Sequence, residues 1–471
     1  MITFDLESLI WHNFEHEPTF EQRNVIKKWC EFLLSREDNG VFVLCGYAGT
    51  GKTSLLGAIV RTMHDLKQSV RLLAPTGRAA KVFSLYADSP AYTIHRKIYR
   101  QKSFAEDCFQ PNVNLQKNTL FIVDEASMIA NDGLSGSIFG TGRLLDDLIH
   151  YVYSGDGCRL MLVGDTAQLP PVGEENSPAL DVQALEGYDL NVYHSMMTQV
   201  VRQVEDSGIL WNATILRRVL MEDDFFDFPR IKVDGVPDVE VVSGNELIEA
   251  LESSYFHSGV DQTVVVTRSN KRAGIFNAGI RGRILGYEEE LSSGDQIMVV
   301  KNNYFWVKEP SDRMPFIANG DCAVVHRLRN ERSLYGFRFV DVSLSFPDYD
   351  DFELEATVLI DTLKSDAPAL TREQQEILFQ SVWEDYPEFG NKRDRMKHVK
   401  EDRHFNALQI KYSYAVTCHK AQGGQWERVF IDQGYVTREM LSPDYVRWLY
   451  TAITRATQKV YLINWPDAQV Y

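Results

Sequence analysis

The sequence predicts an α/β protein with two parallel-sheet lobes and a small β-barrel inserted into the second lobe. Short apolar runs alternate with helical patterns, an order typical of parallel sheets with crossover helices. These runs form two sets, separated by the polar stretch 223–238, and short alternating strands interrupt the second set. The chain has 471 residues, 44% of them hydrophobic, and single cores stop growing at roughly 250–300 residues, so several domains are expected.

The first lobe begins with an amphipathic helix. Thr19 is suited to cap its N-terminus, and apolar residues recur at helical spacing from Phe20 to Leu33, before the turn at 38–40. A second helical pattern spans 54–64. Four apolar runs have the length and composition of strands buried on both faces, namely 41–45, 70–74, 120–123 and 160–163.

The second lobe has three further runs of this kind, 263–266, 429–431 and 460–463. Between the first two, residues 296–344 form short alternating strands with turn signals such as 319–321, which predicts the barrel. Residues 371–405 are helical and charged. Their basic cluster consists of Lys392, Arg393, Arg395, Lys397, Lys400 and Arg403.

Composition excludes several classes of protein. The six cysteines are far apart with no CxxC pair, so we expect free thiols and neither a zinc site nor a disulfide framework. The eleven histidines show no metal-ligand spacing. No run reaches the roughly 18 apolar residues of a spanning helix, and residues 1–17 are acidic, so we expect a cytoplasmic protein without a membrane partner.

The formal charge of −17 argues against a polyanionic partner, because affinity for phosphates comes largely from Lys and Arg. Binding depends on the local field in a groove, however, and the surface average can have the opposite sign. The net charge therefore neither predicts nor excludes a nucleic-acid partner, and the sequence motifs are the better evidence.

Residues 46–53 match the phosphate-binding pattern GxxxxGK[ST], between a buried strand and a helix. In such a loop the backbone N–H groups surround the β-phosphate, Lys52 reaches the β- and γ-phosphates, and the Thr53 hydroxyl binds Mg²⁺. A glycine-rich turn without a ligand is the alternative. ATP and Mg²⁺ are the expected cofactors, and the other nucleotide-binding candidates are Gly46, Ala48, Gly49, Thr50, Gly51 and Ser54.

Asp124 and Glu125 directly follow the apolar run 120–123. A carboxylate at the end of a neighbouring strand holds Mg²⁺ in P-loop enzymes, which is the role we assign to Asp124. Glu125 is the candidate general base for the attacking water. A solvated strand end is the alternative interpretation of this pair.

With these motifs, the chain resembles the superfamily 1 helicases in an ordered series from residue 19 to residue 456. The matching segments are 73–80, 93–95, 164–172, 198–203, 417–423 and 450–456. The resemblance implies that Gln22 contacts adenine, that Gln168 senses the γ-phosphate, and that Arg202 and Arg455 are arginine fingers. It also implies a set of DNA contacts, namely Pro75, Thr76, Thr93, His95, Thr417, His419 and Lys420.

The motif forms at 164–172 and 419–423 resemble the RecD/Dda branch, which moves 5′ to 3′ on single strands. One departure is Gly424-Gln425, because many members of the branch have Ser or Thr close to the position of Gly423. The DNA contact that this Ser or Thr would make is therefore in doubt here. The branch implies two RecA-like lobes, a strand-separating hairpin (the pin) at about 98–118, and an SH3-like barrel in lobe two. Candidate base-stacking aromatics on the pin are Phe104 and Phe109, although they could equally anchor it.

The expected domains are lobe one at 1–200, the start of lobe two at 201–290, the barrel and helical segment at 291–408, and the end of lobe two at 409–471. The basic helical stretch could brace the pin, touch DNA or form a solvated face.

We expect an ATP-dependent DNA helicase that unwinds duplexes in replication, recombination or repair, acting on single-stranded and forked DNA. No nuclease constellation is evident, so a nuclease, a recombination complex or a single-strand-binding protein would be a separate partner. An RNA translocase and an ATP-gated DNA clamp that does not unwind are the alternatives.

Overall fold

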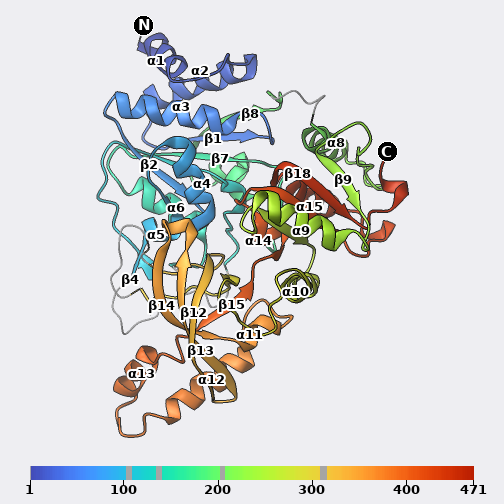
Figure 1. Cartoon of the computed structure of the whole chain (residues 1–471). Coiled ribbons are helices and arrows are strands. Elements are labelled where there is room, and N and C mark those ends of the chain that lie inside the picture. The colour runs from blue at the N-terminus through green and yellow to red at the C-terminus, as the bar shows by residue number, and fades with distance from the viewer. Residues whose placement is uncertain (1, 102–108, 134–139, 202–206, 308–313, 315) are drawn as a thin grey trace.

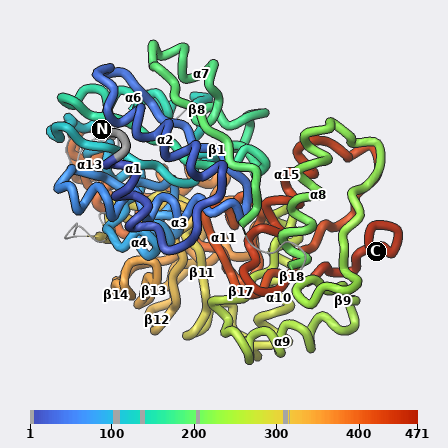
Figure 2. The backbone as a smooth tube through the Cα atoms, turned by 90° about the horizontal axis from the view of Figure 1, so that it is seen from above, coloured from blue at the N-terminus to red at the C-terminus, as the bar shows by residue number. Residues whose placement is uncertain are grey.

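A computed structural model describes residues 2–101, 109–133, 140–201, 207–307, 314 and 316–471. Two α/β lobes lie side by side, and a barrel with a helical extension projects from them (Figure 1). Figure 2 shows the N-terminal helices on one lobe and the C-terminus on the other. In the described part of the chain, no helix is both long and apolar enough to cross a membrane. The cytoplasmic location stays a prediction.

Lobe one is built on a six-stranded parallel sheet in the order β3-β2-β6-β7-β1-β8. Its strands are β1 (Gly40–Gly46), β2 (Ser69–Ala74), β3 (Ala91–Thr93), β6 (Thr119–Val123), β7 (Arg159–Gly164) and β8 (Asn191–Met197). The four predicted runs form the four inner strands. The edge strands β3 and β8 were not predicted, because their residues are mostly half-buried and more polar.

Helices cover both faces of this sheet because alternate strand residues point in opposite directions. Phe42 and Leu44 pack under one group of helices, α1 (Ile2–His12), α2 (Phe20–Leu34), α3 (Lys52–Asp65) and α4 (Gly77–Ala87). Val41 and Val43 pack under the other group, α5 (Ile94–Ile98), α6 (Leu144–Tyr153) and α7 (Val182–Glu186). Thr19 caps α2 in a capping box with Gln22, as its sequence predicts.

A two-stranded antiparallel hairpin extends from lobe one within the range predicted for the pin. It pairs β4 (Tyr99–Gln101) with β5 (Phe109–Pro111). The buried Tyr99 anchors the hairpin, since its hydroxyl donates to Asp147 at 2.6 Å. Phe104 lies outside the described residues, and of Phe109 only the backbone is described.

Lobe two has a five-stranded parallel sheet in the order β16-β10-β17-β18-β9. Its strands are β9 (Val239–Val242), β10 (Thr263–Thr267), β16 (Ala415–Thr417), β17 (Trp426–Asp432) and β18 (Ala456–Ile463). One face packs on α8 (Gly208–Glu222), α14 (Cys418–Ala421) and α15 (Pro443–Ile453). The other packs on α9 (Leu247–Ser258), α10 (Asn270–Gly279) and the barrel.

The barrel is closed by five strands, β11 (Gln296–Val299), β12 (Cys322–Leu334), β13 (Phe337–Phe346), β14 (Phe352–Leu359) and β15 (Leu408–Tyr412). The prediction of a barrel is confirmed, but its range of 296–344 was too short. It omitted β14 and β15, and β15 also passes the boundary expected at 408. The last strand closes the barrel by pairing antiparallel with β11 and parallel with β14, a long-range contact that local alternation cannot reveal.

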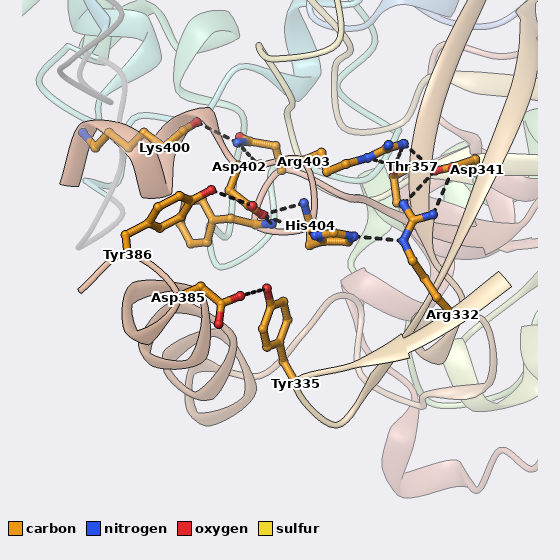
Figure 3. A network of polar contacts seen from close by, with 12 residues as sticks. Arg332, Tyr335, Asp341, Thr357, Asp385, Tyr386, Lys400, Asp402, Arg403 and His404 are labelled. Carbon is orange, nitrogen blue, oxygen red and sulfur yellow. Dashed lines mark hydrogen bonds and ion pairs between the residues drawn. The ribbon is translucent and has the colours of Figure 1, made fainter. Parts of the chain in front are cut away.

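The charged segment forms α12 (Arg372–Glu384) and α13 (Lys392–Glu401), which share a small core with β13. A polar network fastens this segment to the barrel (Figure 3). Arg332 donates to both oxygens of Asp341 at 2.9 Å, and Arg403 donates to Thr357 at 2.9 Å. Burial opposes ionisation of Asp341, but the hydrogen bonds from Arg332 and Thr357 lower its pKa.

Two members of the predicted basic cluster therefore hold the segment together. Arg403 contacts the barrel, and Arg395 donates to the backbone oxygen of Trp383 at 2.8 Å. Contact of the remaining cations with DNA or with the pin stays a prediction.

The barrel also touches lobe one through the turn Pro347–Tyr349, which lies against α4. The Tyr349 hydroxyl donates to the buried Asp321 at 2.9 Å, and Lys81 on α4 donates to the backbone oxygen of Pro347. Burial raises the pKa of Asp321 to about 7. A side chain at Gly77 would clash with Tyr349 and Asp321, so this contact requires glycine at the start of α4.

Candidate active site

The phosphate-binding loop lies where the sequence predicts it, between the buried strand β1 and helix α3. Gly49 and Gly51 have φ angles of 77° and 84°, conformations that glycine adopts without strain. The Lys52 ammonium group donates to the backbone oxygens of Gly46 and Tyr47, the latter at 2.9 Å. The lysine is therefore held inside the loop.

Gln22 is 1% exposed and braces the loop from α2. Its amide oxygen accepts from the Thr19 backbone at 2.9 Å, and its amide nitrogen donates to the Thr50 backbone oxygen at 3.2 Å. Both ends of the amide thus have partners within the protein. The contact with adenine stays a prediction.

Asp124 and Glu125 lie at the carboxyl end of β6, beside the loop. The Tyr86 hydroxyl on α4 donates to Asp124, and the Glu125 backbone N–H donates to Asp124 at 2.8 Å. Burial raises the pKa of both carboxyls; Tyr86 opposes this for Asp124, and Arg455 opposes it for Glu125. Glu125 has a φ of 53°, a strained conformation of the kind found at functional sites.

A single cavity of about 370 Å³ gathers the candidate catalytic groups from both lobes. Lobe one contributes Lys52, Thr53, Ser54, Asp124, Glu125 and Gln168, and lobe two contributes Arg455. The Thr53 hydroxyl and the Asp124 carboxylate are hard oxygen donors of the type that Mg²⁺ prefers, so the residues fit this ion. Among the described residues, no cluster of three or more His, Cys, Asp or Glu forms a separate metal site.

Arg455 is 3% exposed and faces Glu125. One of its terminal nitrogens lies 3.8 Å from the Glu125 carboxylate, and its Nε donates to the Thr451 backbone oxygen at 3.1 Å. Gln168 is 7% exposed, and its side-chain oxygen has no partner among the described residues. A buried acceptor without a partner is suited to bind a water or ligand donor. Arg202, the other expected finger, lies outside the described residues.

Several side chains that join the lobes beside the cavity were not assigned roles from the sequence. The Tyr450 hydroxyl accepts from the Ala48 backbone N–H at 2.9 Å and donates to Asp165 at 2.6 Å. Thr451 accepts from the Leu169 backbone at 2.9 Å. Asp165, Tyr450 and Thr451 lie in the helicase-like motifs, so the sequence could have indicated that they matter. Tyr86, the partner of Asp124, lies in none of these motifs.

On lobe one, the expected DNA contacts follow two adjacent strands, β2 and β3. Pro75 and Thr76 follow β2, and Thr76 caps α4 by accepting from the Ala79 backbone at 3.2 Å. Thr93 ends β3 and caps α5 in the same manner. Burial lowers the pKa of His95 to about 4, so this ring is neutral at pH 7 and can donate to DNA only as a neutral group.

On lobe two, the expected contacts follow the edge strand β16. Thr417 ends that strand, and His419 and Lys420 lie on α14, where burial lowers the pKa of both. Gly423, with a φ of 72°, packs closely against Thr76 and Ala79. Thr76 of the first group therefore lies beside the segment that follows the second group, where the lobes touch.

The departure at Gly424-Gln425 has a structural role at this junction. Arg78 on α4 donates to the Gln425 backbone oxygen at 3.2 Å and stacks on Trp426, 3.9 Å from the ring centre. The segment therefore links the lobes.

Two protein-family models match this chain, one over the lobe-one side of the cavity and one over the lobe-two side. Residues 20–217 match the family described as AAA domain, and residues 412–463 match the UvrD-like helicase C-terminal domain. The first match contains the phosphate-binding loop, Asp124, Glu125 and Gln168. The second contains Arg455 and the candidate DNA contacts of lobe two.

Three relatives align with most of the chain. An uncharacterized protein of Acanthamoeba polyphaga mimivirus is 22% identical, over 93% of this chain and 98% of that protein. An uncharacterized protein of Methanocaldococcus jannaschii is 24% identical over 96% of this chain, and the ATP-dependent RecD2 DNA helicase of Deinococcus radiodurans is 28% identical over 61% of it. The chain spans 38% and 37% of the lengths of these two proteins.

Solved structures of Pif1 helicases are also similar. The Bacteroides protein in complex with ADP-AlF3 and single-stranded DNA is 15% identical, with 97% of this chain and 95% of that chain covered and a TM-score of 0.47. The Candida albicans protein is 16% identical, with 96% of each chain covered and a TM-score of 0.42.

Proposed function

We propose that this chain, a superfamily 1 helicase of the RecD type, hydrolyses ATP to move along single-stranded DNA and to part the duplex ahead of it. The main support is the cavity between the lobes. Lobe one supplies the phosphate loop and the carboxylate pair, and lobe two supplies Arg455. Such a site is complete only while the lobes are together, so turnover and lobe movement are coupled.

The residues of the cavity divide the chemistry between them. Thr53 and Asp124 would hold Mg²⁺, which offsets the phosphate charge when bound. Lys52 reaches the β- and γ-phosphates, and Glu125 accepts a proton from the attacking water. Arg455 places positive charge where the transition state spreads negative charge.

The movement is explained by the two groups of DNA contacts. Thr76 and Thr93 belong to lobe one, and Thr417 and His419 belong to lobe two, with Gly423 packed against Thr76 where the lobes touch. When the cleft opens and closes, one group moves relative to the other along a bound strand. If the two lobes bind the strand tightly in turn, each cycle of hydrolysis moves the protein a small step along the DNA.

The finer assignments come from the resemblance to the RecD/Dda branch. We propose movement in the 5′ to 3′ direction, strand separation at the β4-β5 hairpin, and forked DNA as the working substrate. A nuclease, a recombination complex or a single-strand-binding protein would be a separate partner in recombination or repair.

The test measures unwinding of forks with either a 5′ or a 3′ single-stranded tail, together with ATP turnover with and without DNA. The wild type is expected to unwind the 5′-tailed fork and to show DNA-stimulated turnover. Lys52→Ala should abolish both activities, because it removes the cation that reaches the phosphates. Near-normal turnover in this variant would contradict the site assignment.

The same assay distinguishes the alternatives. Unwinding of the 3′-tailed fork alone would overturn the direction, and preference for a matched RNA fork would indicate an RNA translocase. DNA-stimulated turnover without unwinding of any fork would indicate a clamp.

A further inference from the structure

The last turn of α15 contacts lobe one through three nearby side chains, each at a different part of the cavity. Thr451 binds the Leu169 backbone, and Arg455, just beyond the helix, faces Glu125. Tyr450 contacts the phosphate-binding loop itself. The same short stretch of lobe two therefore touches the loop, the Gln168 segment and the carboxylate pair.

Tyr450 is fully buried, and its hydroxyl has a partner on each side. It accepts from the Ala48 N–H at 2.9 Å and donates to one oxygen of Asp165 at 2.6 Å. The other oxygen of Asp165 accepts from the Ala167 N–H at 2.9 Å. Burial raises the pKa of Tyr450 well above its ordinary value, so the hydroxyl keeps its proton at neutral pH.

This arrangement fixes three catalytic parts relative to one another. Ala48 lies within the phosphate-binding loop, and Asp165 begins the turn that contains Gln168. Arg455 is tied to α15, because its Nε donates to the Thr451 backbone oxygen at 3.1 Å. One hydroxyl on this helix therefore connects the loop, the turn and the finger.

We propose that Tyr450 is a positioning residue for ATP hydrolysis, which sets Arg455 against the phosphate-binding loop and transmits movement of that loop to lobe two. The inference rests on the proposed function. The competing explanation is a buried tyrosine that only stabilises the contact between the lobes. That explanation predicts loss of stability and of nucleotide affinity, with no specific effect on the chemical step.

The variant Tyr450→Phe tests the proposal because it removes one oxygen and keeps the ring. Tyr445→Phe is a matched control: Tyr445 is on the same helix, is 3% exposed, and donates to Gln433 at 2.8 Å within lobe two. Both variants lose one buried tyrosine hydroxyl, which makes two hydrogen bonds at Tyr450 and one at Tyr445. Only the first loses a contact between the lobes.

With saturating DNA, Tyr450→Phe should lower the kcat of ATP hydrolysis about tenfold, the scale expected when buried hydrogen-bond partners are left unsatisfied. The KM for ATP should change less than about threefold, since Lys52 and most of the loop remain. Tyr445→Phe should change neither value by more than about twofold. A rise in KM with unchanged kcat, or equal losses in both variants, would overturn the proposal.

A second variant tests whether Tyr450 acts through Arg455. In an Arg455→Lys background the lysine cannot reproduce the guanidinium geometry, so adding Tyr450→Phe should cost little further kcat. Residues that act as a unit give such non-additive effects. A full tenfold additional loss would show that the two side chains act independently and would overturn the proposal.

Hydrogen exchange gives a readout that requires no turnover, so it separates this inference from the proposed function. A wild type that lacks DNA-stimulated turnover would refute the function alone. The Ala48 and Ala167 amides should exchange at least about tenfold faster in Tyr450→Phe and at the wild-type rate in Tyr445→Phe. Unchanged exchange in Tyr450→Phe would overturn the inference whatever the wild type hydrolyses.

Discussion

Glu125 combines a half-buried side chain, a strained backbone and a facing cation at the end of β6. These features suit a base that must accept a proton from water and then release it. Glu125→Gln keeps the shape of the side chain and removes its basicity. We expect hydrolysis to slow by about 10²–10⁴-fold, the usual loss for a general base, while ATP and DNA still bind.

The check for Glu125→Gln is single-turnover hydrolysis together with equilibrium binding of a fluorescent nucleotide. Loss of nucleotide binding would instead give Glu125 a structural role. Glu174→Gln is a suitable control, because Glu174 receives backbone hydrogen bonds from Asn131 and Asp132 elsewhere in lobe one.

The motifs indicated which side chains gather at one cavity, and the roles of these side chains stay predictions. Lys52, Asp124 and Arg455 were all expected at the nucleotide, and all three line one cavity. Tyr86 could not be found in this way, because its contact with Asp124 depends on how α4 lies across the sheet. The contact of Gln22 with Thr50 was equally hidden, since Thr50 belongs to a loop 28 residues away in sequence.

Among the elements, the contact between the barrel and α4 should respond to pH through Asp321. Its folded-state pKa of about 7 lies above the ordinary 3.8, so between these pH values the folded state holds a proton that the unfolded state has released. The contribution of Asp321 to stability therefore falls as pH rises through this window, by roughly 4 kcal/mol at most.

Thermal unfolding at several pH values checks this expectation. Between pH 5 and pH 8, the wild-type Tm should fall more than that of Asp321→Asn, whose amide oxygen can still accept from Tyr349. The exposed Asp351, replaced by Asn, should leave the wild-type slope unchanged. Identical slopes in the wild type and Asp321→Asn would contradict the assignment.

The β4-β5 hairpin lies outside every ATP motif. Replacing the sequence between its two strands, residues 102–108, with a short glycine-rich sequence keeps the buried anchor Tyr99 and its bond to Asp147. We expect unwinding of 5′-tailed forks to fall, because the proposed pin would part base pairs at roughly 1.4 kcal/mol per step. Single-stranded DNA should still stimulate ATP turnover, and equal loss of both activities would refute the separate role.

Prediction of the elements depended on burial. Strands buried on both faces give continuous apolar runs and were found from the sequence. The edge strands β3 and β8 and the half-polar β14 alternate or mix residue types, so they were missed. Strand β15 was missed because its partners in the barrel are remote in sequence.

At the scale of the whole molecule, an arginine finger at Arg455 would make hydrolysis depend on contact between the lobes. Arg455→Ala should lower DNA-stimulated kcat by on the order of 10³-fold, the lower end of the range for a lost finger. Unwinding should fall as a consequence, with single-stranded DNA binding retained. Turnover, fork unwinding and DNA affinity would be measured side by side.

Arg447→Ala is the matched control, because Arg447 also reaches from α15 to lobe one, where it donates to the Glu175 backbone oxygen at 2.7 Å. It should keep most of the turnover. If Arg455→Ala and Arg447→Ala lowered ATP turnover equally, the loss would be explained by weaker contact between the lobes. An arginine finger at Arg455 would then not be needed to explain it.

The approach of the lobes was predicted only through the resemblance. Hydropathy shows that two sheets exist, but it does not say which ends of them face each other. That geometry depends on contacts such as Tyr450 with Ala48 and Arg78 with Trp426, which join residues hundreds of positions apart.

The route of the chain through lobe two also sets an order of assembly. Strands β9 and β10 precede the barrel, whereas β16, β17 and β18 follow it, so the sheet and the barrel are both finished by late segments. During synthesis, lobe one can pack while β10 still lacks both of its neighbours. Unpaired strand edges are prone to aggregate, so we expect the half-made second lobe to be the stage of synthesis most exposed to aggregation.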